Sequence, residues 1–139
     1  MRLHQIPVHA IFASVSDVAE QVLVREWQGL LARHAAVFGA LECRLQEQHG
    51  IGVSDFEALE CLATAEQKCR GADITDAVHL SQSATSRLVA RLEREGLVER
   101  AMCEMDRRGI FVNLTEAGHK LYAEAKPTQR AVLKEMLGT

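Results

Sequence analysis

Small polar and basic side chains are concentrated between residues 81 and 91, where they could together contact nucleic acid. If this stretch is a helix capped by Ser81, one face carries Ala84, Leu88 and Leu92, and the other carries Gln82, Ser83, Ser86, Arg87 and Arg91. Small residues at the start of a helix let its backbone come close to a DNA groove. The backbone N–H groups of the first turn, which have no partner inside the helix, can then hold a phosphate. Arg87 has the fork geometry for guanine O6 and N7, whereas Arg91 is better placed for phosphate. The alternative for both arginines is a solvated helix face.

A second basic pair, Arg107 and Arg108, stands between Asp106 and Gly109, in the stretch that separates two predicted strands. A narrow minor groove has an enhanced negative potential, which attracts arginine without requiring a particular base. The pair is therefore a second candidate DNA contact. Glu104 weakens a purely electrostatic attraction, and the alternative is a loose charged turn.

The elements that position these side chains are predicted from apolar periodicity and helix caps. Residues 1–13 are expected to form an arm, followed from about Val15 by one long helix, or by two with a joint near Glu26, ended by Gly50. The next helices are expected after a Ser54–Glu57 capping box, over 72–78, over 81–95, and after Thr115, where Pro127 should kink or divide the last one. The strands are expected at 97–102 and 110–114, with inward Ile110, Val112 and Leu114, a connector at 64–70 and a turn at 103–109.

This order of elements predicts a mainly α fold with a small β-hairpin wing. Two helices joined by a short turn and followed by a hairpin describe a winged helix-turn-helix. The chain has 139 residues, which predicts a single domain. Its longest stretch without charged residues, 3–16, is too short to span a membrane.

Charge and composition narrow the possible functions. The net charge is −3, but residues 51–79 hold 2 basic and 6 acidic groups while residues 80–110 hold 6 and 5, so the arginines follow the acidic block. Aromatic residues make up 4% of the chain, which argues against a stacking platform for single-stranded nucleic acid. We find no sequence motif of a hydrolase, metalloprotease or nucleotide-binding enzyme and no metal-ligand spacing, so we expect neither an enzyme nor a cofactor or metal. The four cysteines form no CxxC pair, which favours reduced thiols and a cytoplasmic location.

Two segments carry a family resemblance: LSQSATSRLVARLEREGLVER at 80–100 and DRRGIFVNLTEAG at 106–118. Together they make the chain similar to the MarR (multiple-antibiotic-resistance regulator) family of bacterial transcription factors, over about residues 27–127. The resemblance implies a homodimeric repressor that binds a pseudo-palindromic site on double-stranded DNA. It also implies a division into a dimerising N-terminal segment (1–26), a long first helix (27–50), a winged domain (51–114, with the wing at 97–114) and a dimerising C-terminal helix (115–139).

The resemblance also assigns roles to individual residues. Arg108 would enter the minor groove, Arg107 would face phosphate, and Asp106 would hold one guanidinium in line. His79 stands in the turn where relatives usually have Gly, and histidine tolerates positive φ better than most residues.

Relatives often bind small aromatic acids between the first helix and the winged domain, so a small aromatic or phenolic effector is expected. The residues that could line such a crevice are Trp27, His34, Phe38 and Phe56. The alternative for each of them is plain core packing.

Two other function classes stay open. Cys103, near Arg100, Arg107 and Arg108, could be a redox-sensing thiol, although Glu104 is adjacent to it. A winged helix with negative net charge could also be a protein-interaction module without DNA binding.

The ends of the chain depart from the family pattern. MarR-like chains normally end with a further dimerisation helix, whereas here Thr139 follows soon after Pro127 and extra residues precede Trp27. We hypothesise that the N-terminal segment replaces part of the dimer surface, packing its apolar side chains on the last helix: Ile6, Val8, Ile11, Phe12, Val15, Val18 and Val22.

Overall fold

The computed structural model describes the backbone of residues 8–103 and 106–138 and the side chains of residues 15–102 and 109–138. The chain divides into two compact units, residues 1–36 and 37–139, and each is described by itself. None of the described helices is long and apolar enough to cross a membrane.

Helix α1 (Val8–His49) supplies nearly all of the first unit and the start of the second. It begins inside the stretch expected to be an arm, so that expectation was wrong for residues 8–13, and residues 1–7 lie outside the described part. No helix-breaking residue lies between Val8 and Ser14, so nothing in the sequence prevents the helix from beginning before Ser14. It is also a single helix without a joint near Glu26, and Gly50 ends it at φ 68°, as predicted.

Helices α2 (Val53–Thr64), α3 (Gly71–Val78) and α4 (Gln82–Arg94) follow in the second unit. The predicted capping box at Ser54–Glu57 was misplaced by two residues, because Asp55 accepts a hydrogen bond from the backbone N–H of Gly52 at 2.8 Å. The turn between α3 and α4 was predicted correctly. His79 caps α3 in the left-handed region (φ 56°), and Ser81 Oγ accepts from the Ala84 N–H at 3.1 Å.

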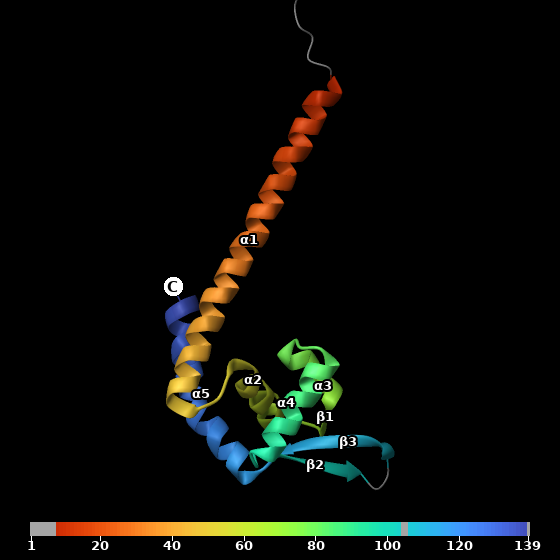
Figure 1. Cartoon of the computed structure of the whole chain (residues 1–139), viewed down its shortest axis with the longest axis vertical. Coiled ribbons are helices and arrows are strands. Elements are labelled where there is room, and N and C mark those ends of the chain that lie inside the picture. The colour runs from red at the N-terminus through yellow and green to blue at the C-terminus, as the bar shows by residue number, and fades with distance from the viewer. Residues whose placement is uncertain (1–7, 104–105, 139) are drawn as a thin grey trace, which may run out of the picture. The chain divides into compact units, whose positions relative to one another are not determined.

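Three strands rather than two form the wing, as an antiparallel sheet in the order β1-β3-β2. They are β1 (Cys69–Arg70), β2 (Val98–Cys103) and β3 (Asp106–Leu114), and Figure 1 shows β2 and β3 as a hairpin that extends from the helices of this unit. The turn expected at 103–109 was too long, since β3 already begins at Asp106.

The added strand β1 changes which residues of β3 are buried. Phe111 and Val112 are both buried, whereas Ile110, expected to point inward, is 52% exposed. The reason is that β1 pairs with β3 at Phe111, and the cationic groups of Lys68 and Arg70 each lie 5.2 Å from the Phe111 ring. A side chain that should have faced solvent is therefore covered by a neighbouring strand.

Helix α5 (Glu116–Leu137) completes the second unit. Thr115 caps it as predicted, accepting from the Gly118 N–H at 3.1 Å. Pro127 does not divide it, and Figure 1 draws it as one ribbon that bends along its length. A Cβ placed on Gly118 would stand 2.1 Å from the carbonyl oxygen of Leu97, so this glycine allows α5 to approach the start of the wing.

The core of the second unit is a single apolar cluster drawn from all five helices and the sheet. Its fully buried members include Leu45, Phe56, Leu59, Ile74 and Leu92. This cluster fixes the orientation of α4, the helix with the predicted DNA contacts.

Candidate nucleic-acid interface

Helix α4 has one buried and one exposed face, as predicted, but Ala84, expected to be buried, is only half-buried, because Thr85 and Val89 take its place on the packed side. Its buried side is formed by Thr85, Leu88, Val89 and Leu92, each at most 5% exposed. Ser81, Gln82, Ser83, Ser86 and Arg87 are exposed, and they lie at or within the first two turns of the helix. We call these five residues the outer face of α4. It presents hydroxyl, amide and guanidinium groups, the groups that hydrogen-bond base edges and phosphates.

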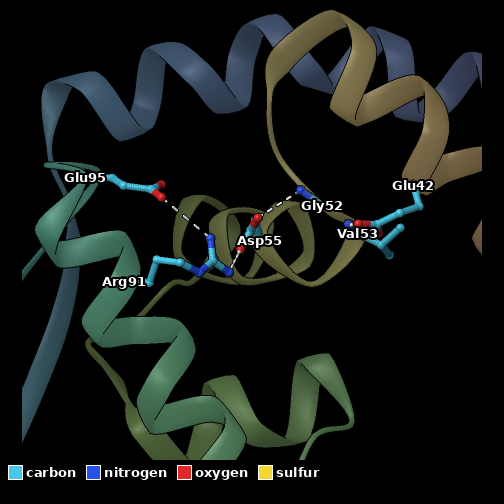
Figure 2. Close-up of polar contacts among 6 residues, drawn as sticks. All are labelled: Glu42, Gly52, Val53, Asp55, Arg91 and Glu95. Carbon is cyan, nitrogen blue, oxygen red and sulfur yellow. Dashed lines mark hydrogen bonds and ion pairs between the residues drawn. The ribbon is translucent and has the colours of Figure 1, made fainter.

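Arg91 differs from the other predicted contacts on α4 because its guanidinium contacts a carboxylate of the protein itself. It donates a hydrogen bond to the Asp55 carboxylate and lies 3.8 Å from Glu95 (Figure 2). The Asp55 side chain is 8% exposed, whereas that of Arg91 is 43% exposed. The hydrogen bond with Asp55 raises the pKa of Arg91, which favours its charged form.

The ion pair connects α4 with the start of α2. Asp55 also accepts from the Gly52 N–H, and Glu42 of α1 accepts from the Val53 N–H at 2.9 Å (Figure 2). These carboxylates thus accept from backbone N–H groups at the N-terminus of α2, which have no partner inside the helix. Sequence reasoning missed both residues, although an acidic residue three positions after Gly52 is a capping signal.

For the residues of the wing that were predicted to contact DNA, the structure describes only the backbone. Asp106, Arg107 and Arg108 form the start of β3, and Cys103, at the end of β2, pairs with Asp106 across a register irregularity. Their side chains lie outside the described part of the chain. Their predicted contacts, and the redox role of Cys103, therefore stay predictions.

A cavity of about 270 Å³ lies beside the ion pair, within the second unit. Its lining residues come from α1, α2 and α4: Phe38, Glu42, Gln46, Gly52, Val53, Ser54, Asp55 and Arg91. Among the predicted effector contacts, Phe38 lines it, whereas Phe56 is fully buried in the core with its ring centroid 5.7 Å from that of Tyr122. Trp27 and His34 belong to the first unit, where both are exposed.

A polar cluster joins α2 and α5. Glu60 accepts hydrogen bonds from Tyr122, at 3.1 Å, and from Arg130. Burial acts to raise the pKa of Glu60, but these hydrogen bonds outweigh it, so the pKa is lowered. Glu57, one turn earlier, has a raised pKa, because of burial and then of the nearby Glu60 charge.

Two other thiols, Cys61 and Cys69, are poorly suited to react as thiolates. The pKa of Cys61 is raised to about 11, first by burial and second by the neighbouring Cys69 thiol. Burial also raises the pKa of Cys69. Within the described part of the chain, no group of three His, Cys, Asp or Glu side chains is placed to hold a metal ion.

Comparison with known proteins connects this geometry with a family. A model of the MarR family matches residues 49–109, which span the helix-turn-helix and most of the wing. The chain is 29% identical over 94 residues to the transcriptional repressor MprA of Escherichia coli, an alignment that covers 67% of this chain and 53% of the repressor. The chain thus spans about half the length of this curated relative.

Solved structures give fuller matches. AbsC, a MarR family transcriptional regulator from Streptomyces coelicolor, is 32% identical, with a TM-score of 0.74 over 80% of this chain and 75% of AbsC. Sco3205, a MarR family regulator from the same organism solved in complex with DNA, is 27% identical, with a TM-score of 0.76 over 86% and 74%. With its sequence matches to the helix-turn-helix and its structural matches over most of its length, this chain belongs to the MarR family of transcriptional regulators.

Proposed function

We propose that the chain is a sequence-specific regulator, most simply a repressor, that binds double-stranded DNA through the outer face of α4. The observation that carries this proposal is the exposure of Ser81, Gln82, Ser83, Ser86 and Arg87 opposite a fully packed helix face. A helix held by the core along one side can present its other side to a major groove. The structure of the related regulator Sco3205 in complex with DNA supports DNA as the partner of this chain.

The test is an anisotropy titration of a fluorescent duplex selected from the source genome by binding to the full chain. Arg87→Ala should weaken binding by roughly 1–3 kcal/mol and relax preference at one base. Lys134→Ala, which removes an exposed charge from the last turn of α5, is the matched control and should bind like the parent. Unchanged binding by Arg87→Ala would show that the outer face of α4 does not read DNA.

Salt dependence separates this function from a protein-interaction module. Binding through phosphate contacts should fall steeply as salt rises, because counterions are released from DNA on binding. A flat salt response, or no DNA selected at all, would favour the interaction module.

The proposed DNA-binding form is a homodimer on a pseudo-palindromic site, with half-site centres roughly 10 base pairs apart. Large apolar side chains of α1 are exposed within this chain, including Val15, Val18 and Val22 at 55–63% and Trp27 at 58%. Soluble chains rarely leave such a row uncovered, which supports a second copy as its cover. Light scattering of the chain without residues 1–20 tests this assembly, and an unchanged dimer would show that the segment is not needed.

The proposed effector site is the cavity beside Phe38. The Phe38 ring offers an apolar surface for a small aromatic or phenolic molecule, and Arg91 offers a guanidinium to its polar end. An occupant would contact the ion pair that holds α4 against α2, so binding there could change the presentation of the outer face. Phe38→Ala should reduce the release of DNA by 4-hydroxybenzoate, and equal release from both proteins would exclude this cavity as the site.

A further inference from the structure

Two cysteine thiols lie close together between α2 and β1, within the second unit. Cys61 belongs to the last turn of α2 and Cys69 begins β1. The Cys69 thiol donates to the carbonyl oxygen of Cys61 at 4.0 Å, and the Cys61 thiol donates to the carbonyl oxygen of Asp73 at 3.9 Å. After burial, the Cys69 thiol is the next cause of the raised pKa of Cys61, as expected for neighbouring sulfur atoms. Folding thus brings together two thiols that are eight residues apart in the chain.

The thiol pair is accessible from solvent. Cys61 is only half-buried. Cys69 is buried, but it lines an open cavity of about 450 Å³ formed by residues 62–69, the end of β3 and His119 of α5. A small cation can therefore approach the pair from this cavity.

The number of ligands limits which cation the pair could hold. Thiolate ligands select soft metal ions. Within the part of the chain that the structure describes, no third His, Cys, Asp or Glu is placed to complete a metal site with them. Structural zinc sites take four such ligands, so zinc is a poor occupant. A suitable cation must be satisfied by two sulfur atoms, as the mercuric ion is in its linear dithiolate complexes.

Charge distinguishes a divalent from a monovalent soft cation. The carboxylate of Asp73 lies near both thiols, and its negative charge raises the pKa of each. A monovalent ion held by two thiolates would leave a net negative charge beside this carboxylate. A divalent ion gives a neutral complex, like the two thiols that it replaces. Electrostatics therefore favours the divalent ion.

We propose that Cys61 and Cys69 form a two-coordinate site for a divalent thiophilic cation, with the mercuric ion as its example. Binding breaks two S–H bonds, forms two S–Hg bonds and releases two protons to solvent, with no change of oxidation state. The occupied site would connect α2 with β1. Because Cys69 pairs with Val112, it would also connect α2 with the sheet of the wing.

The test adds one equivalent of mercuric chloride to the reduced full chain. Loosely held metal is removed by dialysis against an equal concentration of 2-mercaptoethanol, and the chain is weighed by native mass spectrometry. The parent should gain the mass of one mercury atom less two hydrogen atoms. Cys61→Ser and Cys69→Ser should each lose the metal. Cys43→Ser is the matched control and should retain it, because this variant removes only an exposed thiol of α1.

A second measurement does not depend on variants. Thiols are mostly protonated at pH 7, so a site of two thiolates should release two protons for each ion bound, whereas a single thiolate releases one. A pH indicator in weakly buffered solution counts them. One proton per ion, retention by folded Cys61→Ser equal to that of the parent, or mercury that bridges two chains would each overturn the proposal. Zinc retained after the same dialysis would also contradict it, because a further ligand would then complete the site.

Discussion

Arg91→Met tests whether the pair with Asp55 stabilises the packing of α4 on α2. The substitution keeps most of the apolar stem but removes the charge. Removing one partner of a fully buried ion pair costs about 3–5 kcal/mol, whereas exposed pairs contribute about 0.2–1 kcal/mol. Asp55 is nearly buried but Arg91 is 43% exposed, and Asp55 keeps its hydrogen bond from the Gly52 N–H. We therefore expect a loss of about 1.5 kcal/mol in the free energy of unfolding, between the two limits.

The assay is urea denaturation of the parent, Arg91→Met, Asp55→Asn and the double variant, which together form a double-mutant cycle. Glu95→Ala is the control, because its exposed pair with Arg91, four residues earlier, should contribute only about 0.3–0.5 kcal/mol. Most of the Asp55–Arg91 coupling should persist in high salt, since its carboxylate is shielded from solvent. If the two single effects add within about 0.3–0.5 kcal/mol, the pair is not coupled and α4 is held by apolar packing alone.

Four further predictions concern single positions. Glu57→Gln should raise Tm at pH 7, because a carboxyl whose pKa is raised by folding opposes folding once it is ionised. This gain should vanish well below pH 4.5, where the carboxyl is protonated in both the folded and the unfolded state. A gain that does not change with pH would contradict this explanation. Gly118→Ala should cost several kcal/mol or prevent folding, since its Cβ would meet the Leu97 carbonyl at 2.1 Å, whereas a loss under 0.5 kcal/mol in urea would mean that the close approach is absent. His79→Gly should stabilise the chain by about 1 kcal/mol in the same assay by removing a side chain from a left-handed backbone, and destabilisation would indicate that the imidazole makes a needed contact. In native alkylation at pH 7 followed by mass spectrometry, the exposed Cys43 should react well before Cys61, whose pKa is about 11, and equal rates would argue against burial of the latter.

The parts of the fold that sequence predicts well are those controlled by neighbours in the chain. Ser81 and Thr115 cap the helices that they precede, and Gly50 ends α1, because each signal acts within about one turn. The division of α4 into a buried and an exposed face follows in the same way from helical periodicity.

The parts that sequence predicts poorly depend on segments far apart in the chain. The two-residue strand β1 is too short to show an alternation of apolar and polar residues. It forms because it pairs with the edge of β3, and this pairing buries Phe111. Similarly, no local pattern connects Arg91 with Asp55, 36 residues earlier. The fold class and the outer face of α4 were therefore predictable, whereas the pairing of Arg91 with Asp55 and the pairing of β1 with β3 were not.

The pairing of Arg91 with Asp55 holds the proposed DNA-reading face of α4 in place, while the predicted phosphate contact of Arg91, whose side chain is 43% exposed, stays a prediction. Each residue of a helix is rotated about 100° from the one before, so the packing of Leu88, Val89 and Leu92 leaves the rotation of α4 little freedom. The Asp55 pair adds a polar contact on the flank of the same helix. Gln82, Ser86 and Arg87 then project from a helix held on two sides, and sequence preference is expected to depend on the first two turns rather than on the whole length of α4.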